Sequence, residues 1–94
     1  MKPSIIVRVE IYKEGDVYVG ICPDLDVSSF GETVDETRQS LREALDAFFE
    51  ASEEMGTLDD ILEEAGFVRD GSNWLARQPV SIGLVPVGEG GSAR

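Results

Sequence analysis

The residues that could do chemistry in this chain are one cysteine and many carboxylates, because histidine is absent. Cys22 stands in the sequence Cys22-Pro23-Asp24. A reactive thiol needs a cation, a histidine or a helix N-terminus beside it to lower its pKa. No cation is close to Cys22 in sequence, and carboxylates follow it. The pattern therefore favours a buried structural cysteine over a nucleophile.

The carboxylates do not predict a catalytic or metal centre. A two-metal nuclease needs several acids that converge on ions about 3.5–4 Å apart. Glu10 is the only acid in the first expected strand, and residues 80–87 contain none. Asp59-Asp60 and Glu63-Glu64 fall on an expected helix, whereas calcium sites use loop ligands around a glycine. Without histidine, the commonest general base and most zinc sites are also lost. We expect no catalytic, metal-binding or cofactor-binding residue, and no enzyme.

The net charge excludes one class of partner and favours another. The chain carries 19 acidic and 8 basic residues, a net charge of −11. The excess is concentrated in residues 32–64, where Arg38 and Arg42 are the only basic side chains. Such a surface repels phosphate backbones, so direct nucleic-acid binding is not expected. It attracts a basic protein, although an acidic helix can also serve only to keep a small protein soluble.

The elements that must position these residues follow from hydrophobic periodicity. Alternation over 4–13 and 17–22, with a turn at Glu14-Gly15-Asp16, predicts an antiparallel hairpin. A third strand is expected over 27–30. Thr33 and Glu36 form a capping box before a helix that runs to Gly56. The apolar stripe expected along this helix consists of Val34, Leu41, Ala44, Leu45, Phe48, Ser52 and Met55.

The rest of the chain predicts a second helix and a late β segment. The second helix covers 58–65, and Gly66 and Phe67 fit a glycine C-cap. Extended chain is expected over 74–77 and 80–87. The fold class is therefore α+β: a three-stranded antiparallel meander with a long helix on one face. We expect one domain over 1–87, a flexible Gly/Ser-rich tail over 88–94, no membrane span and a cytoplasmic location.

Three stretches follow one another along the chain: Tyr18–Leu25 (YVGICPDL), Gly31–Glu36 (GETVDE) and Leu41–Leu45 (LREAL). In this order they resemble the HicB-like antitoxin family. The resemblance covers about Ile5 to Phe67 and implies a small truncated RNase H-like fold. It further implies a homo-oligomer, a dimer or tetramer, that binds and covers a small basic mRNA-cleaving ribonuclease toxin. The chain departs from the family where Asp26-Val27-Ser28 replaces a Pro-Gly-Cys, and nothing after Phe67 resembles a DNA-binding domain. An orphan, self-associating member that binds another protein or a small ligand is the alternative.

The candidate interface is the outward face of the hairpin together with the turn that follows it. Two tyrosines and aliphatic side chains with few charges predict an interface there. Alternatively, the late β segment with Trp74, Ile82, Leu84 and Val85 folds back over this face. In an antitoxin, the turn carboxylates and the acidic patch of Glu53, Glu54, Asp59 and Asp60 would mimic an RNA backbone. The interface residues are Ile6, Arg8, Tyr12, Tyr18, Cys22, Asp24 and Asp26.

Overall fold

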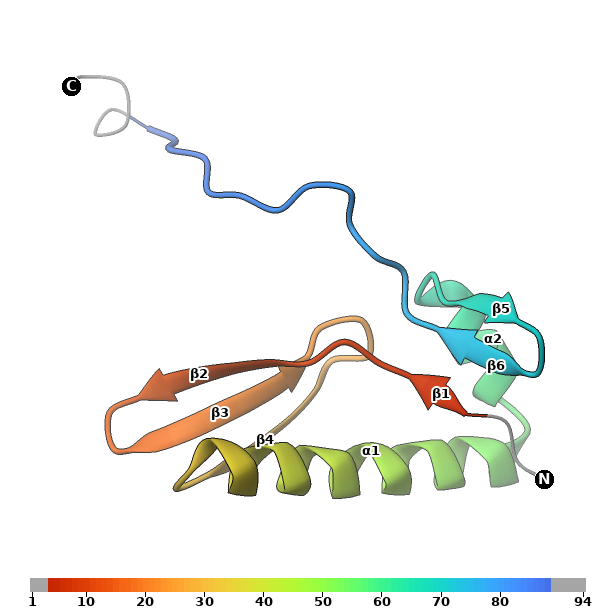
Figure 1. Ribbon diagram of the computed structural model, residues 1–94. Helices are drawn as coiled ribbons and strands as arrows, with labels where there is room; N and C mark the ends of the chain where they lie inside the picture. The colour runs from red at the N-terminus through yellow and green to blue at the C-terminus, as the bar shows by residue number, and fades with distance from the viewer. Residues whose placement is uncertain (1–3, 89–94) are drawn as a thin grey trace.

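Residues 4–88 are described by the computed structural model, and they form two small sheets and two helices (Figure 1). This confirms the predicted α+β class. In chain order the elements are β1 (Ile5–Ile6), β2 (Glu10–Glu14), β3 (Val17–Cys22), β4 (Val27–Gly31), α1 (Val34–Met55), α2 (Leu58–Glu64), β5 (Val68–Asp70) and β6 (Asn73–Leu75).

The meander β2–β3–β4 is antiparallel throughout, as the alternation predicted. Tyr12 lies opposite Val19, and Val19 lies opposite Phe30. Directly opposed residues of an antiparallel pair place their side chains on the same face of the sheet. The register therefore fixes which side chains face α1 and which face away from it.

The first extended segment does not form the single strand that its alternation predicted. It divides into β1 and β2, with residues 7–9 between them in no strand. β1 pairs in parallel with β6, whereas β2 pairs with β3. The segment 5–14 therefore connects the two sheets, so that one part of it lies in each (Figure 1).

α1 begins and ends where the sequence predicted. The Thr33 hydroxyl accepts a hydrogen bond from the Glu36 amide at 3.0 Å, and Gly56 ends the helix with φ of 75°. The Glu36 carboxylate accepts from the amide of Glu32 rather than that of Thr33. The glycine at the C-cap is favoured because a left-handed conformation costs it nothing sterically.

The buried stripe of α1 is shorter than predicted. Val34 and Met55 are exposed, so the two ends of the expected stripe lie in water. The fully or nearly buried positions are Thr37, Leu41, Leu45 and Ser52. The Thr37 hydroxyl donates to the carbonyl of Thr33 at 2.8 Å, which satisfies a polar group that would otherwise be costly to bury.

Two glycines allow α1 to approach the meander closely. A Cβ on Gly20 would lie 3.0 Å from Thr37 Cγ2, and one on Gly31 would lie 2.8 Å from the Thr37 backbone nitrogen. A side chain at either position would push the helix away from the sheet, because packed interiors leave no slack.

The second half of the core forms where α2, β5 and β6 close over the first strand. Leu62, Phe67, Trp74 and Ala76 form one buried cluster, and Cys22, Leu41 and Leu45 form the other. Val7, Leu25 and Phe49 pack against both clusters, so the core is continuous. Phe67 packs on Leu62 after Gly66, as the C-cap pattern predicted.

Residues 77–88 leave this core and form no helix or strand. We call this segment the C-terminal arm. It extends from β6 on the side of the sheet opposite α1 (Figure 1). Late β structure is thus found at 68–70 and 73–75, not at 80–87. Of the expected flexible tail, residues 89–94 lie outside the described part of the chain.

Replacing Gly31 by alanine should destabilise the protein by about 1–3 kcal/mol, because the new methyl group collides with the backbone of α1. Urea unfolding measures the change. Gly83→Ala is the matched control, since a Cβ there has nothing within 4 Å. The control should stay within about 0.5 kcal/mol of the parent protein. Equal stability of the two variants would contradict this account of the contact between α1 and β4.

Candidate interaction surface

The side of the meander that faces away from α1 is an uncovered apolar surface. We call it the outer face and define it by Tyr12, Val17, Val19, Ile21 and Phe30, which the strand register places on one side of the sheet. Phe30 is 68% exposed and Tyr12 is 50% exposed. Among residues 4–88, no helix or strand covers this surface. Exposed apolar patches of this kind mark interaction sites in small proteins.

Two predicted interface residues lie on the opposite side. Tyr18 and Cys22 lie on the same face of β3 as Gly20. A Cβ atom on Gly20 would contact Thr37 and Leu41, so this face is the one that packs against α1. Cys22 is completely buried, and the expectation that it faces outward is wrong. The predicted alternation of β3 is correct, but the face that was expected to point outward is the face that packs against α1. The glycine at position 20 explains why, because α1 packs against the face that offers the closest approach.

Cys22 is instead part of the core, as the structural interpretation of this cysteine predicted. Its side chain packs with Leu41 and Leu45. Burial raises the pKa of the Cys22 thiol, because removal from water disfavours the thiolate. A thiol that is both buried and protonated is a poor nucleophile.

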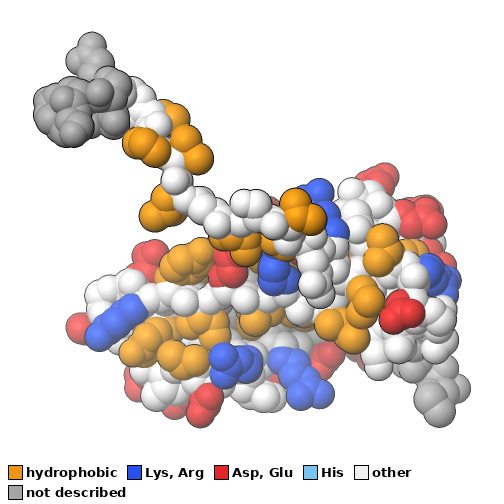
Figure 2. All heavy atoms as spheres, turned by 45° about the horizontal axis from the view of Figure 1, so that its top comes forward, with side chains coloured by type: hydrophobic (Ala, Val, Ile, Leu, Met, Phe, Trp, Pro, Cys, Tyr) orange, Lys and Arg blue, Asp and Glu red, His pale blue; other side chains and the backbone are white. Residues whose placement is uncertain are grey.

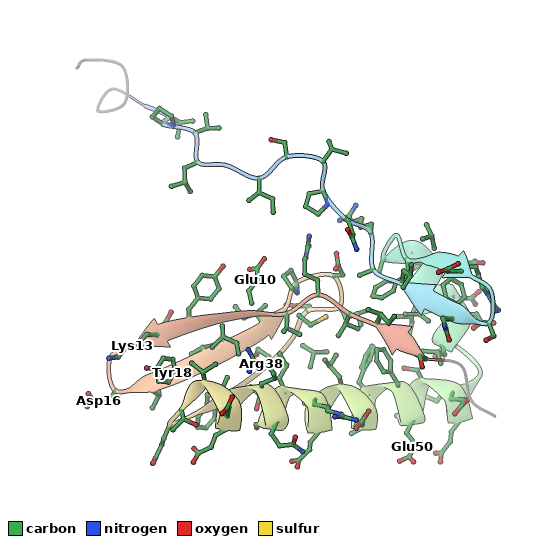
Figure 3. All side chains as sticks on the ribbon, in the orientation of Figure 1. Glu10, Lys13, Asp16, Tyr18, Arg38 and Glu50 are labelled. Atoms are coloured by element: carbon green, nitrogen blue, oxygen red, sulfur yellow. The ribbon has the colours of Figure 1, made fainter. Side chains whose placement is uncertain are left out.

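Tyr12 lies on the outer face and is hydrogen-bonded to its neighbour along that face. Its hydroxyl donates to Glu10 Oε1 at 2.8 Å. This hydrogen bond, followed by the negative charge of Glu10, raises the pKa of the Tyr12 phenol. Figure 3 shows Glu10 on the side of the sheet away from α1 and Tyr18 on the side toward it.

Asp24 is a structural residue that joins three parts of the fold. Its side chain is 1% exposed and lies 3.5 Å from Arg8 Nη2 and 3.5 Å from Arg77 Nε. Arg8 precedes β2, and Arg77 is the first residue of the C-terminal arm. The carboxylate therefore holds the turn after β3, the first strand segment and the base of the arm together. A carboxylate this deeply buried cannot act as a free anionic contact for a partner.

The remaining predicted residues are accessible. Ile6 is 52% exposed, and it lines a hollow of about 400 Å³ between β1 and the base of the arm. Asp26 is exposed and adopts φ of 57°, in a turn where its amide donates to the Cys22 carbonyl at 2.9 Å. The structure therefore leaves Ile6, Tyr12 and Asp26 as surface contacts, with Arg8 half-buried against Asp24.

Sequence reasoning missed two parts of this surface. Phe30 was assigned only to a strand, although its alternation with Ser29 already places it on the face opposite that serine. The C-terminal arm was expected as β structure. Its apolar side chains are instead bare: Val80 is 105% exposed, Leu84 is 101% and Ile82 is 84%. The alternative that the late segment folds back over the hairpin is therefore wrong for these residues, and Trp74 is buried in the core.

A groove of about 690 Å³ runs between the first strand segment and α1. Its floor is apolar, with Val9, Leu41 and Phe49 among the lining residues, while Arg38 and Glu50 stand at its rim. Within the described part of the chain, no three carboxylates or sulfur ligands converge as a metal would require. The groove can hold an apolar segment, and charged side chains of both signs line it.

The acidic surface predicted from composition follows the helices. Asp59 and Asp60 lie in the first turn of α2, where the helix dipole favours them. Arg69 approaches Asp59 at 3.9 Å and lies over the ring of Trp74 at 4.6 Å. The last turn of α1 has no basic residue and carries Glu53 and Glu54. This part of the surface is therefore strongly negative.

Comparison with family models, curated proteins and solved structures found no match to this chain. In residues 4–88, neither helix is long and apolar enough to cross a bilayer. The interpretation of the surface therefore depends on its own geometry and charge.

The buried thiol makes a direct prediction. In the native protein Cys22 should react with Ellman's reagent only as fast as the protein unfolds, and it should react at once in strong denaturant. The time course of absorbance at neutral pH measures this. Rapid stoichiometric reaction without denaturant would show that the thiol is accessible.

Replacing Asp24 by asparagine should cost about 1–3 kcal/mol of stability, because Arg8 loses its buried carboxylate partner. Chemical unfolding measures the loss. Asp26→Asn is the control, since Asp26 is exposed and asparagine also adopts its left-handed conformation. If the control variant is as unstable as Asp24→Asn, the buried Asp24 carboxylate has no particular role in stability.

Proposed function

We propose that this protein is a noncatalytic, HicB-like antitoxin that binds and covers a small basic mRNA-cleaving ribonuclease. The proposal is carried by one observation: acidic side chains dominate α1 and α2. A protein that inhibits a basic toxin by covering its active site needs a negatively charged surface and no catalytic group.

The order of elements supports the resemblance. A three-stranded antiparallel meander is followed by a long helix, and a later strand returns to pair in parallel with the first segment. This is the arrangement that the truncated RNase H-like fold of the family implies. Parallel strands need a long connection between them, usually a helix, and α1 with α2 lies in the connection between β1 and β6.

The charge distribution supports a basic partner. Glu53, Glu54, Asp59 and Asp60 lie together around the junction of α1 and α2. A toxin that cleaves RNA must carry cationic side chains for the phosphates of its substrate. Carboxylates on this protein would occupy those side chains and steer the encounter over long distances.

The second candidate is an orphan module of the same fold that associates with itself. The exposed outer face favours it, because an apolar face with Phe30 at 68% exposure is unusual on a protein that stays alone. Both proposals place the protein in the cytoplasm. The genes beside this one separate them: a short basic reading frame favours the antitoxin, and a solitary gene favours the orphan.

The antitoxin proposal predicts that this protein co-purifies with the product of an adjacent short basic reading frame and rescues growth when that product is expressed. The double variant Glu54→Lys, Asp60→Lys should bind the toxin about tenfold more weakly, mostly through slower association. It should also flatten the salt dependence of the affinity. Titration calorimetry at two salt concentrations measures both effects.

The matched control is Asp16→Lys, Glu32→Lys, which changes the net charge equally at the far end of the meander. Asp16 lies in the β2–β3 turn, and Glu32 lies just after β4. Both double variants should retain the parent's unfolding transition. Equal affinity of the two double variants would remove the α1–α2 junction as the contact, and the absence of co-purification and rescue would overturn the antitoxin proposal.

A further inference from the structure

The C-terminal arm and the outer face are both apolar and exposed, and their side chains are arranged so that each surface could cover the other. In an extended arm, Val80, Ile82 and Leu84 point to one side, while Ser81 and Gly83 point to the other. The outer face presents Val17, Val19 and Phe30 in neighbouring strands. The space-filling view shows apolar side chains along the arm as it projects from the body (Figure 2). Each surface is of the kind that the other would cover.

The dimensions of the arm and the sheet agree. The six residues from Val80 to Val85 contain no proline and span about 20 Å when extended. β3, the central strand of the meander, is also six residues long. The apolar side of the arm can therefore lie along the full length of this strand.

The arm is joined to the body as far as Ala76 and forms no helix or strand beyond it. Ala76 still donates to the Ile6 carbonyl at 2.9 Å, so the chain is fixed up to that residue. Pro79 has no amide to continue the ladder, and it holds Gln78 in an extended conformation. The arm then runs on the side of the sheet away from α1 and stands off from the meander, so its own outer face is left uncovered (Figure 1).

Charge explains why the arm, and not the body, would make this contact. Two copies of a chain with a net charge of −11 repel one another. Residues 78–88 contain no charged side chain. An uncharged arm can cross to a second copy without placing carboxylates against carboxylates.

From these observations we infer that the protein forms a two-fold dimer by arm exchange, in which the C-terminal arm of each copy packs on the outer face of the other. Val80, Ile82 and Leu84 of one copy lie against Val17, Val19 and Phe30 of its mate. The contact occurs twice in a closed pair, so each copy uses its arm and its face once and no further copies are recruited. This inference specifies the self-association named above and does not depend on the toxin.

Mass in solution is the first test, using light scattering after size exclusion on the full chain. The parent protein should have twice the mass of the 10.2 kDa chain. Ile82→Asp, Leu84→Asp on the arm and Phe30→Asp on the face should each give monomers. Met55→Asp is the matched control, because Met55 is an exposed apolar residue at the end of α1, and it should leave the dimer intact.

Mixing the arm variant with the face variant tests the exchange itself. The arm variant keeps an intact face, and the face variant keeps an intact arm, so one of the two contacts can form between them. The mixture should contain a weak heterodimer that neither variant forms alone. Circular dichroism melts verify that both variants are folded, and the arm variant changes only side chains that are at least 84% exposed.

A nitroxide on the arm separates exchange from folding back. The label is placed at Val87→Cys, since native Cys22 is buried and should not react. Spin-labelled protein without isotope is mixed with ¹⁵N-labelled parent protein. Exchange predicts broadening of β3 and β4 amides in the ¹⁵N copy. A second sample, in which each chain carries both the nitroxide and ¹⁵N, is measured for comparison. Broadening in this sample but not in the mixture would show that the arm covers its own sheet, and would overturn the inference.

The remaining outcomes are equally decisive. A parent protein that is monomeric, or a dimer that survives both the arm and the face variants, would overturn arm exchange. Added salt should tighten the dimer by screening the repulsion between acidic bodies, whereas it should weaken a complex with a basic toxin. Loss of toxin binding with the dimer intact would therefore count against the antitoxin proposal alone.

Discussion

The close packing of α1 on one face of the meander is the constraint on which the rest of the molecule depends. Gly20 and Gly31 let the helix approach until Thr37 and Leu41 lie against the backbone of the sheet. A single helix can cover only one face of a sheet, so this contact also determines what stays bare. The outer face is exposed because α1 is on the other side and no second long helix exists among the described residues.

A buried carboxylate connects this packing to the rest of the chain. Asp24 binds Arg8 and Arg77, and so it links the meander to the point where the arm begins. Only the carboxylate is buried, since the Arg8 side chain is 35% exposed and the Arg77 side chain is 69% exposed. Asp24 thus joins the turn after β3 to the segment before β2 and to the base of the arm.

The surface of the protein divides into two regions with different physical properties. The acidic region at the α1–α2 junction acts through long-range attraction and favours a basic partner. The outer face and the arm are apolar, and they act through burial at short range. Because the two regions lie on different elements, the proposed self-association and the proposed binding of a basic protein would use different side chains.

The sequence by itself determined the local structure of this protein: the α+β class, the hairpin, the caps of α1 at Thr33 and Gly56, and the acidic character of the helices. These features depend on residues that are neighbours in the chain, where periodicity and capping chemistry act directly. Only the tertiary structure decided that Cys22 and Tyr18 face the helix, that Asp24 is buried, and that the segment after Pro79 stays unpaired. Alternation shows that a strand has two faces, but which face is buried depends on where a helix distant in sequence can approach most closely, and here two glycines settle that question.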